Sequence, residues 1–298
     1  MGSPHIGRTR RLTFKERETN HMEKLVIIAG SGKYPRLLVE GAKKAGVPQV
    51  DVVAIAGSTW RETRKAADHV IPITIGTIAE SIRKLGKMGY DGGILAGQVN
   101  PLSLFRGRFD REVTAWLKEL PVKNAHTVFS KLIEKFAESG LKILPASLYM
   151  DDHLPGVGPL TKRGFTADEQ SDIDHAVAVV KDMGVHDVGQ TVMVKRGMVL
   201  AVEAFEGTNK AIRRGGRLGG KGSVIFKAAR EGHDMRFDIP VIGLKTLKAM
   251  KKAGATALGF QAGRQIVLDR DEVIDFANRN DIAIVGVDSG LPPAPVRV

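Results

Sequence analysis

The sequence predicts an α/β protein of two domains, a mostly parallel α/β domain followed by an α+β domain. Three observations lead to this prediction. The chain has 298 residues, which is more than one compact core usually needs. From Met22 to about residue 150, short apolar strands alternate with amphipathic helical stretches. After a segment rich in Gly and Pro at 151–166, a hairpin pattern and a glycine-rich stretch replace that alternation.

The first domain, residues 22–150, is expected to be a Rossmann-like parallel sheet with helices on its faces. Pro35 suits the first turn of a helix, and Gly46 suits its end. Thr77 and Glu80 have the spacing of a capping box at the start of a second helix. The expected strands are 25–29, 50–57, 69–73, 92–97 and 142–146, and the expected helices are 35–46, 77–89, 110–120 and 126–139.

The second domain, residues 167–298, is expected to follow a linker at 151–166. Thr166 and Glu169 form another capping-box pattern, which predicts a helix to about Met183. The remaining expected elements are a hairpin at 191–204 that turns at Arg196-Gly197, a basic glycine-rich loop at 213–222, strands from 223 and near 256–260, 265–268 and 282–287, and helices at 244–253 and from 271.

Residues 1–21 are basic and have no apolar centre, so they do not form a secretory signal and are expected to be a disordered extension or tag. The chain contains no cysteine, which excludes disulfides and cysteine chemistry. No apolar run approaches the roughly 20 residues that cross a bilayer. These features favour a cytoplasmic protein.

The net charge of +12, of which residues 1–21 account for +3, favours an anionic partner. The basic residues are scattered along the chain and have no interleaved aromatic residues. This pattern favours a phosphorylated small molecule over nucleic acid.

The stretch GSGKYP (30–35) lies between the first expected strand and the first expected helix. Gly30 and Gly32 fit the start of a dinucleotide fingerprint, but Pro35 stands where the third glycine belongs. Two glycines at a helix start still let backbone N–H groups approach an anion, so both are candidate substrate contacts. The alternative is a tight strand-to-helix turn without a ligand.

Gln98 follows the expected strand 92–97, at the carboxyl edge where parallel sheets bind ligands. A neutral amide at this position is suited to contact a base or a sugar. The alternative is a polar residue that caps a turn.

The segment VEAFEGTNKAIRRG (202–215) is the densest polar cluster of the chain. Glu203 and Glu206 are suited to a hard divalent cation such as Mg²⁺, which commonly uses one or two carboxylates together with substrate phosphates. Thr208 is suited to a helix start, and Arg213 is suited to pair with a phosphate. The alternative is a solvated hairpin end followed by an ordinary helix.

The segment EGHDMRFDIPVIG (231–243) contains two acids and an arginine at alternate positions, Asp234, Arg236 and Asp238. If this stretch is extended, the three side chains share one face. A carboxylate that orients water, beside an arginine on the phosphate, suffices for phosphoryl transfer. The alternative is a salt bridge on an edge strand.

Three segments together resemble one family in their order and spacing: IAGSGKYP, GQTVMVKRGMVLAVEAFEGTN, and HDMRFDIPVIG followed by QAGRQIVLDRDEVI. From Met22 to about Val287 the chain resembles the LpxI family, the UDP-2,3-diacylglucosamine pyrophosphatases of lipid A biosynthesis. The resemblance implies a Mg²⁺-dependent hydrolase in which water attacks the α-phosphate, giving UMP and 2,3-diacylglucosamine 1-phosphate (lipid X).

The resemblance also implies the partners and the location of the protein. The lipid-linked UDP-sugar substrate is expected to lie between the two domains. A cytoplasmic enzyme would collect this lipid through transient, peripheral contact with the inner face of the inner membrane. No nucleic-acid partner is expected, and a homodimer stays open.

The resemblance assigns the catalytic role, and the residue patterns described above supply the other candidate site residues. It implies that Asp238 is the catalytic carboxylate, supported by Asp234 and Arg236. Asp238, Glu203 and Glu206 are the expected metal ligands. The expected substrate contacts are Gly30, Gly32, Gln98, Gln190, Thr208, Arg213 and Lys227.

Asn209 and Gln261 depart from the family pattern, which usually has an acid at each position. If either acid is a metal ligand in relatives, metal affinity is expected to be lower here, although an amide oxygen also coordinates. The residues alone leave two other functions open. One is a nucleotide-binding protein or oxidoreductase that uses the glycine loop, and the other is a basic RNA-binding module without activity.

Overall fold

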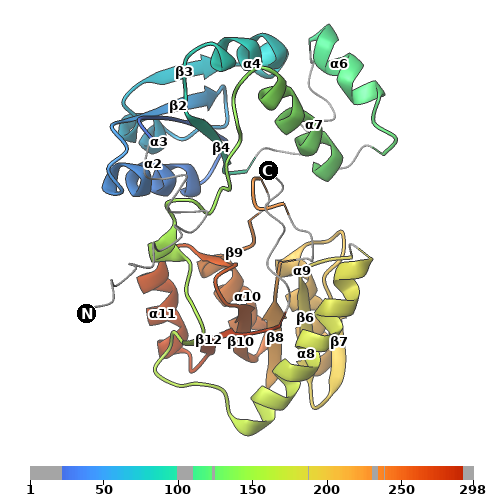
Figure 1. Cartoon of the computed structure of the whole chain (residues 1–298). Coiled ribbons are helices and arrows are strands. Elements are labelled where there is room, and N and C mark those ends of the chain that lie inside the picture. The colour runs from blue at the N-terminus through green and yellow to red at the C-terminus, as the bar shows by residue number, and fades with distance from the viewer. Residues whose placement is uncertain are drawn as a thin grey trace, which may run out of the picture. The chain divides into compact units, whose positions relative to one another are not determined.

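The computed structural model describes residues 22–98, 110–122, 125–186, 188–229, 234–237 and 239–290 (Figure 1). The expected extension at 1–21 lies outside these residues. The chain divides into two compact units, which meet in sequence at Leu144 and Pro145. Each unit has its own main sheet.

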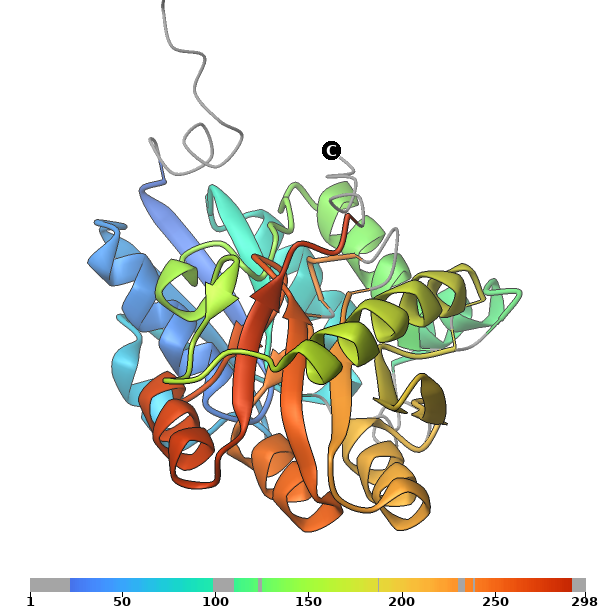
Figure 2. The same cartoon turned by 90° about the horizontal axis from the view of Figure 1, so that it is seen from below.

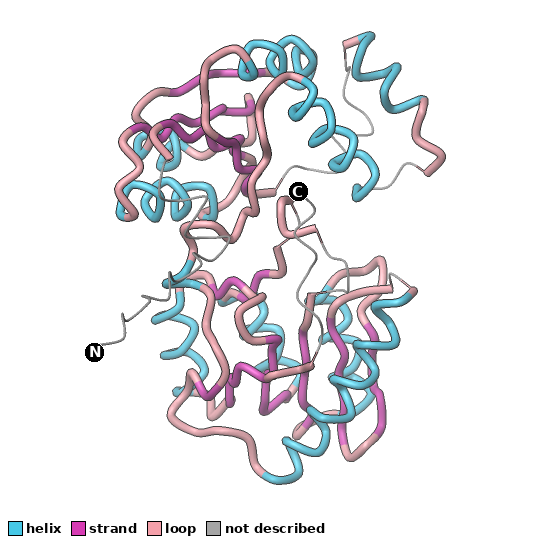
Figure 3. The backbone as a smooth tube through the Cα atoms, viewed as in Figure 1, coloured by secondary structure: helices cyan, strands magenta, loops and turns pink. Residues whose placement is uncertain are grey.

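The first unit contains a four-stranded parallel sheet in the order β3-β2-β1-β4, which matches the first four strands of the Rossmann order. The predicted Rossmann-like domain is therefore confirmed, and Figure 3 shows its strands and helices alternating along the chain. Its strands are β1 (Lys24–Ala29), β2 (Gln49–Ile55), β3 (Val70–Ile73) and β4 (Gly92–Ala96), and its helices are α2 (Tyr34–Lys44), α3 (Arg61–Ala66), η1 (Ile75–Thr77), α4 (Ile78–Gly86), α6 (Arg111–Lys118) and α7 (Ala125–Glu138).

Two local predictions for the first unit are wrong. The strand expected at 142–146 is reduced to a single parallel bridge between Gly93 and Ile143, because Pro145 has no N–H group to continue the pairing. The capping box expected at Thr77 is also absent from α4. Thr77 instead completes the preceding η1 turn, where its hydroxyl oxygen accepts a hydrogen bond from the backbone N–H of Thr74 at 3.4 Å.

The second unit contains a six-stranded mixed sheet in the order β5-β12-β10-β8-β6-β7 and a small parallel pair, β11-β9. The three central strands β12, β10 and β8 are parallel, and the outer strands are antiparallel to their neighbours. The elements are η2 (Asp151–His153), β5 (Gly158–Pro159), α8 (Ala167–Val185), β6 (Thr191–Lys195), β7 (Met198–Val202), α9 (Thr208–Gly219), β8 (Ser223–Lys227), β9 (Val241–Ile242), α10 (Leu244–Ala253), β10 (Ala255–Gln261), β11 (Ile266–Val267), α11 (Arg270–Arg279) and β12 (Ala283–Val287). The expected α+β domain is thus observed.

Helices cover both faces of this six-stranded sheet, and Figure 2 shows α8 crossing the strands on one of them. Successive side chains of a strand point to opposite faces. Val224 and Phe226 of β8 accordingly pack with Ile173 of α8, whereas Ile225 packs with Met250 of α10. All five side chains are fully buried or nearly so. Each face of the sheet therefore has its own apolar core.

The glycine-rich stretch expected to be a loop at 213–222 is mostly helical, because α9 continues to Gly219. Glycine is unfavourable inside a helix by about 1 kcal/mol. Here its small size allows close packing: a Cβ at Gly215 would overlap the Met193 side chain, and a Cβ at Gly216 would overlap Ala253. Tertiary packing therefore outweighs the low helix propensity of these glycines.

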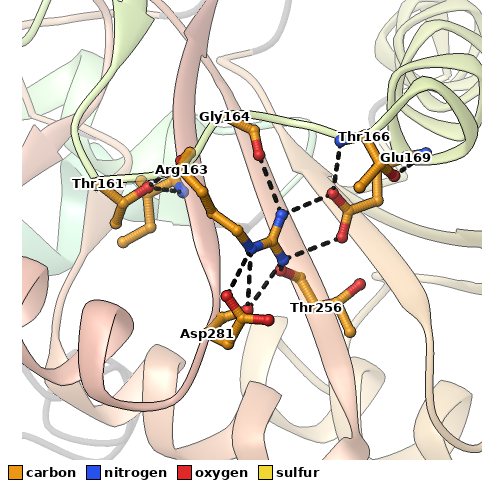
Figure 4. A network of polar contacts seen from close by, with 8 residues as sticks. Thr161, Arg163, Gly164, Thr166, Glu169, Thr256 and Asp281 are labelled. Carbon is orange, nitrogen blue, oxygen red and sulfur yellow. Dashed lines mark hydrogen bonds and ion pairs between the residues drawn. The ribbon is translucent and has the colours of Figure 1, made fainter.

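The segment expected to be a linker, 151–166, lies within the second unit, where its strand β5 pairs with β12. Arg163 fixes this segment through the contacts in Figure 4. Its Nη1 lies 2.8 Å from Glu169 Oε2, its Nε lies 2.9 Å from Asp281 Oδ1, and its Nη2 donates to the backbone oxygen of Thr256. Glu169 also closes the predicted capping box with Thr166, which is confirmed.

Candidate functional site

The carboxyl edge of the second sheet gathers most of the predicted site residues. The parallel strands β8 and β10 end there, at Lys227 and Gln261. The neighbouring strand β6 runs the opposite way and begins at this edge, where Thr191 lies opposite Lys227. Gln190 therefore precedes β6 at the same edge, and Glu203 follows β7 there, with its N–H bonded to Thr191 O at 2.8 Å. Ligands of open α/β sheets bind at such an edge.

A chain of polar contacts joins three of these residues. The hydroxyl of Thr208, the first residue of α9, donates to the Glu203 carboxylate at 2.9 Å from Oε1. The Lys227 ammonium group lies 3.4 Å from Thr208 Oγ1 and donates to Val241 O at 3.0 Å. The side chain of Lys227 is buried, with 7% exposure. The sheet edge therefore presents a buried cation beside the start of a helix.

Glu206 belongs to a different contact pair. Its Oε1 lies 2.6 Å from Nη2 of Arg214, and its Oε2 accepts from the N–H of Ala204. The hydrogen bond from Arg214 holds the pKa of Glu206 below its usual range. Arg213 is exposed on α9, and within the described ranges the structure gives it no ion-pair partner. Arg213 and Arg214 of α9 therefore differ in their availability to a ligand.

Asp234 and Arg236 form an ion pair in a turn, with Arg236 Nη2 2.6 Å from Asp234 Oδ2. The same carboxylate accepts from the backbone N–H of Arg236, and Phe237 N–H bonds to Asp234 O at 3.3 Å. The expectation of an extended stretch with a shared face is therefore wrong for 234–237, because the aspartate hydrogen-bonds two residues along its own backbone. Asp238 lies outside the described residues.

Sequence reasoning missed Arg264, in the turn after β10. Its Nε and Nη2 atoms are buried, and no described residue hydrogen-bonds to them. Burial also holds the pKa of Arg264 below its usual value. Gln261, at the start of this turn, accepts a hydrogen bond from Ala229 N–H at 3.0 Å, so the turn is fixed to the segment after β8. The burial of these two atoms without a partner in the described residues is a tertiary property that the QAGR sequence does not reveal.

The glycine loop of the first unit has a packing explanation. Ser31 and Gln98 pair through backbone hydrogen bonds of 2.8 and 2.9 Å. A Cβ at Gly30 would lie within 2.9 Å of the Gln98 carbonyl carbon, and Gly97 is similarly close to Ser31. Gly32 has φ +101° and open space around it. Gly30 is therefore required by the contact between two loops, whereas Gly32 stays available to a ligand.

Asp51, the acid that a dinucleotide site would need, lies far from this loop along its strand. It pairs in register with Val26, near the amino end of β1, whereas Gly30 follows the carboxyl end. The Asp51 side chain is buried and accepts hydrogen bonds from Tyr90 and Gln49 at 2.8 and 2.7 Å. This acid therefore has a structural role, and the oxidoreductase alternative still rests on the glycine loop alone.

Within the described ranges, no three His, Cys, Asp or Glu side chains are grouped closely enough to hold a metal ion. The Glu203 carboxylate accepts a hydrogen bond from Thr208 and has further lone pairs that can bind a cation. Asn209 has a buried Oδ1 without a partner in the described residues. These oxygen donors are of the type that Mg²⁺ prefers. In the same described part of the chain, no helix is long and apolar enough to cross a membrane.

Comparison with known proteins gives matches across both units. The model of the LpxI N-terminal domain matches residues 24–153, and the model of the LpxI C-terminal domain matches residues 156–285. A curated protein from Caulobacter vibrioides, UDP-2,3-diacylglucosamine pyrophosphatase LpxI, is 30% identical over 281 residues. This similarity covers 90% of the present chain and 98% of that relative.

Proposed function

The chain belongs to the LpxI family, and we propose on this basis that it is an enzyme that hydrolyses the pyrophosphate bond of UDP-2,3-diacylglucosamine. The products are UMP and 2,3-diacylglucosamine 1-phosphate, which places the reaction in lipid A biosynthesis. One observation carries the proposal: both family domains match in succession, and the relative is covered over 98% of its length. A match to the whole layout supports a shared reaction better than a match to one domain.

The chemistry of the second sheet's edge supports a phosphorylated substrate. Lys227 offers a buried ammonium group, and α9 begins beside it at Thr208. The first N–H groups of a helix have no intrahelical partners and favour an anion. A pyrophosphate at this edge would meet both features.

Asp238 is proposed as the carboxylate that orients the attacking water or holds the metal. Its neighbours support this role, because Arg236 is held by Asp234 at 2.6 Å in a turn that ends one residue before it. In phosphoryl transfer the protein contributes mainly positioning and charge. A fixed arginine next to an acid supplies both.

We include Mg²⁺ in the proposal, with Glu203 and Asp238 as the residues that would hold it. Asn209 adds an oxygen donor in the same segment as Glu203. Glu206 is less suited, since its carboxylate already pairs with Arg214. When bound, the ion supplies positive charge against the phosphate oxygens.

A lipid-linked substrate is supported by Phe205, which lies between Glu203 and Glu206 and is fully exposed. An exposed aromatic side chain beside a polar cluster is suited to contact an acyl chain or a membrane surface. Peripheral contact with the inner membrane and a homodimer both stay predictions.

Product analysis tests the proposed function. The purified protein is incubated with UDP-2,3-diacylglucosamine in H₂¹⁸O, and the products are identified by mass spectrometry. UMP and 2,3-diacylglucosamine 1-phosphate in equal amounts are expected. Attack on the α-phosphorus puts the label in UMP, whereas a label in the sugar phosphate would place the attack on the β-phosphorus. Absence of both products from folded protein would contradict the proposal.

A further inference from the structure

Arg264 is a partly buried, positively charged side chain, and one edge of its guanidinium group has no partner in the described residues. Its Nε and Nη2 atoms have no solvent contact and no hydrogen-bond partner in the described residues. Leaving a charged donor unpaired costs more free energy than leaving a neutral group unpaired. Such groups in folded proteins need an explanation, and a bound ligand is one.

The two unpaired atoms are the ones that bind an oxyanion. Nε and Nη2 lie on the same edge of the planar guanidinium group and point their N–H bonds in parallel. This fork matches two oxygens of a phosphate or carboxylate, which gives the strong bidentate pairs that arginine forms. Arg264 is therefore unpaired at its recognition edge.

The backbone of the turn is fixed by two hydrogen bonds to other segments and by one within the turn. Ala262 N–H bonds to Val287 O at 3.1 Å, Gly263 N–H bonds to Pro155 O at 2.8 Å, and Arg264 N–H bonds to Gln261 O at 3.3 Å. These hydrogen bonds order the backbone of the turn before a ligand binds. A preorganised arginine loses less entropy on binding.

Gln265, the next residue, also has buried polar atoms without hydrogen-bond partners in the described residues. Its side chain is completely buried, and both amide atoms lack partners in the described part of the chain. The following residue, Ile266, donates to Pro240 O at 2.9 Å, two residues after Asp238 in the sequence. The unpaired polar groups therefore lie just before β11, whose partner strand β9 follows the proposed catalytic segment.

The turn also adjoins the Lys227 site. Strands β8 and β10 are neighbours, with Phe260 opposite Lys227. Gln261 bonds to Ala229, two residues beyond Lys227. Lys227 at the end of β8 and Arg264 in the turn after β10 thus lie at the same edge of the sheet. Two cationic side chains at one edge suit a ligand with more than one phosphate.

We propose that the Nε/Nη2 edge of Arg264 binds a phosphate group of the substrate's pyrophosphate, next to the Lys227 site. The proposal rests on the proposed function for the identity of the substrate. Its chemical content is a binding site for a nucleoside diphosphate group, which can be measured without turnover.

The test measures binding of UDP and of uridine by calorimetry, in EDTA, to wild type, Arg264→Met, Arg264→Lys and Arg217→Met. Arg217 is exposed on α9 and controls for loss of one charge. Arg264→Met is expected to weaken UDP binding about 30-fold and Arg264→Lys about 10-fold, because lysine keeps the charge but loses the fork. Uridine binding is expected to be equal in all four proteins, and Arg217→Met is expected to match wild type.

Thermal unfolding of the free proteins separates a binding role from a structural one. Removing an unpaired buried charge is expected to leave the Tm of Arg264→Met equal to or above that of wild type. Gln265→Leu is expected to behave in the same way, because its buried amide also lacks partners. A Tm several degrees lower for both variants, with unchanged UDP affinity, would show a structural role and overturn the proposal.

The outcomes distinguish this proposal from the proposed function. If wild type releases UMP but Arg264→Met binds UDP as well as wild type, the Arg264 proposal fails alone. If UDP binding depends on Arg264 but no UMP is formed from UDP-2,3-diacylglucosamine, the proposed function fails and the phosphate site stands. Wild type that binds neither UDP nor inorganic pyrophosphate would overturn the Arg264 proposal.

Discussion

The hydroxyl of Thr208 donates to the Glu203 carboxylate at 2.9 Å, and its oxygen lies 3.4 Å from the Lys227 ammonium group. One hydroxyl thus connects an acid and a buried cation at the start of α9. This arrangement holds Lys227 and Glu203 in fixed relation at the sheet edge where the substrate is proposed to bind.

Thr208→Val is expected to lower kcat/KM for UMP release about 10-fold, because valine keeps the side-chain shape but removes both contacts. Thr208→Ser keeps the hydroxyl and is expected to retain most of the activity. The two variants are compared in the same UMP-release assay. Equal activity of the serine and valine variants would show that the hydroxyl is not needed.

Arg163→Met is expected to lower the free energy of unfolding by about 2–4 kcal/mol, because the mostly buried Glu169 loses its partner. The backbone oxygen of Thr256 loses a donor as well. Urea denaturation measures the effect, and Arg279→Met, an exposed change on α11, is the control. A loss no larger than that of the control would show that the network in Figure 4 is not stabilising.

The same pair makes a pH prediction. Burial alone raises the pKa of Glu169, but hydrogen bonds from Arg163 and from the Thr166 backbone outweigh it, and the pKa lies below its usual value. A carboxyl group whose pKa is lower in the folded state stabilises the protein at pH values above the unfolded-state pKa of about 4.3. The protein loses this stabilisation as the pH falls through the folded-state pKa. The stability gap between wild type and Arg163→Met is therefore expected to be constant from pH 7 to 5 and to narrow below about pH 4.

Gly216→Ala is expected to destabilise the protein by about 1–3 kcal/mol, because the new Cβ would lie 2.6 Å from the Cα of Ala253. Gly219→Ala is the matched comparison on the same helix. The three atoms nearest to its new Cβ all belong to the end of the Leu200 side chain, which can rotate, and alanine favours the helix by about 1 kcal/mol. If thermal unfolding shows that the two variants lose equal stability, this account of the packing of α9 is contradicted.

UMP release is expected to stop in EDTA and to return when Mg²⁺ is added. Asn209→Asp is expected to lower the Mg²⁺ concentration for half-maximal activity severalfold, because it replaces a buried, unpartnered amide oxygen with a carboxylate. Gln261→Glu is the control, since the side-chain oxygen of Gln261 already accepts from Ala229. Full activity in EDTA would remove Mg²⁺ from the proposal.

The first unit was predictable because its strands are continuous apolar runs between good helix signals. β1 and β2 lie within one or two residues of their expected ranges. In the second unit, the Thr166 capping box forms as its spacing predicts. The hairpin also turns at Arg196-Gly197 as expected, with both residues at positive φ. In each case the local sequence agrees with the tertiary environment.

The differences arise where distant contacts decide the structure. Gly215 and Gly216 favour a loop by propensity, but Met193 and Ala253 occupy the space that side chains at these positions would need. Arg264 looks like any surface arginine in the sequence, and only the fold buries its Nε and Nη2 atoms. Sequence spacing also cannot distinguish an extended stretch from the turn that holds Asp234 and Arg236.

The rate of UMP release by Asp238→Asn tests the central claim most directly, because Asp238 is the proposed catalytic acid. The variant is compared with wild type and with Asp182→Asn, an exposed change on α8, under saturating UDP-2,3-diacylglucosamine and Mg²⁺. Asp238→Asn is expected to fold, to bind the substrate and to lose at least about 10³-fold in turnover. Turnover near that of wild type would contradict the assignment of the reaction to this segment.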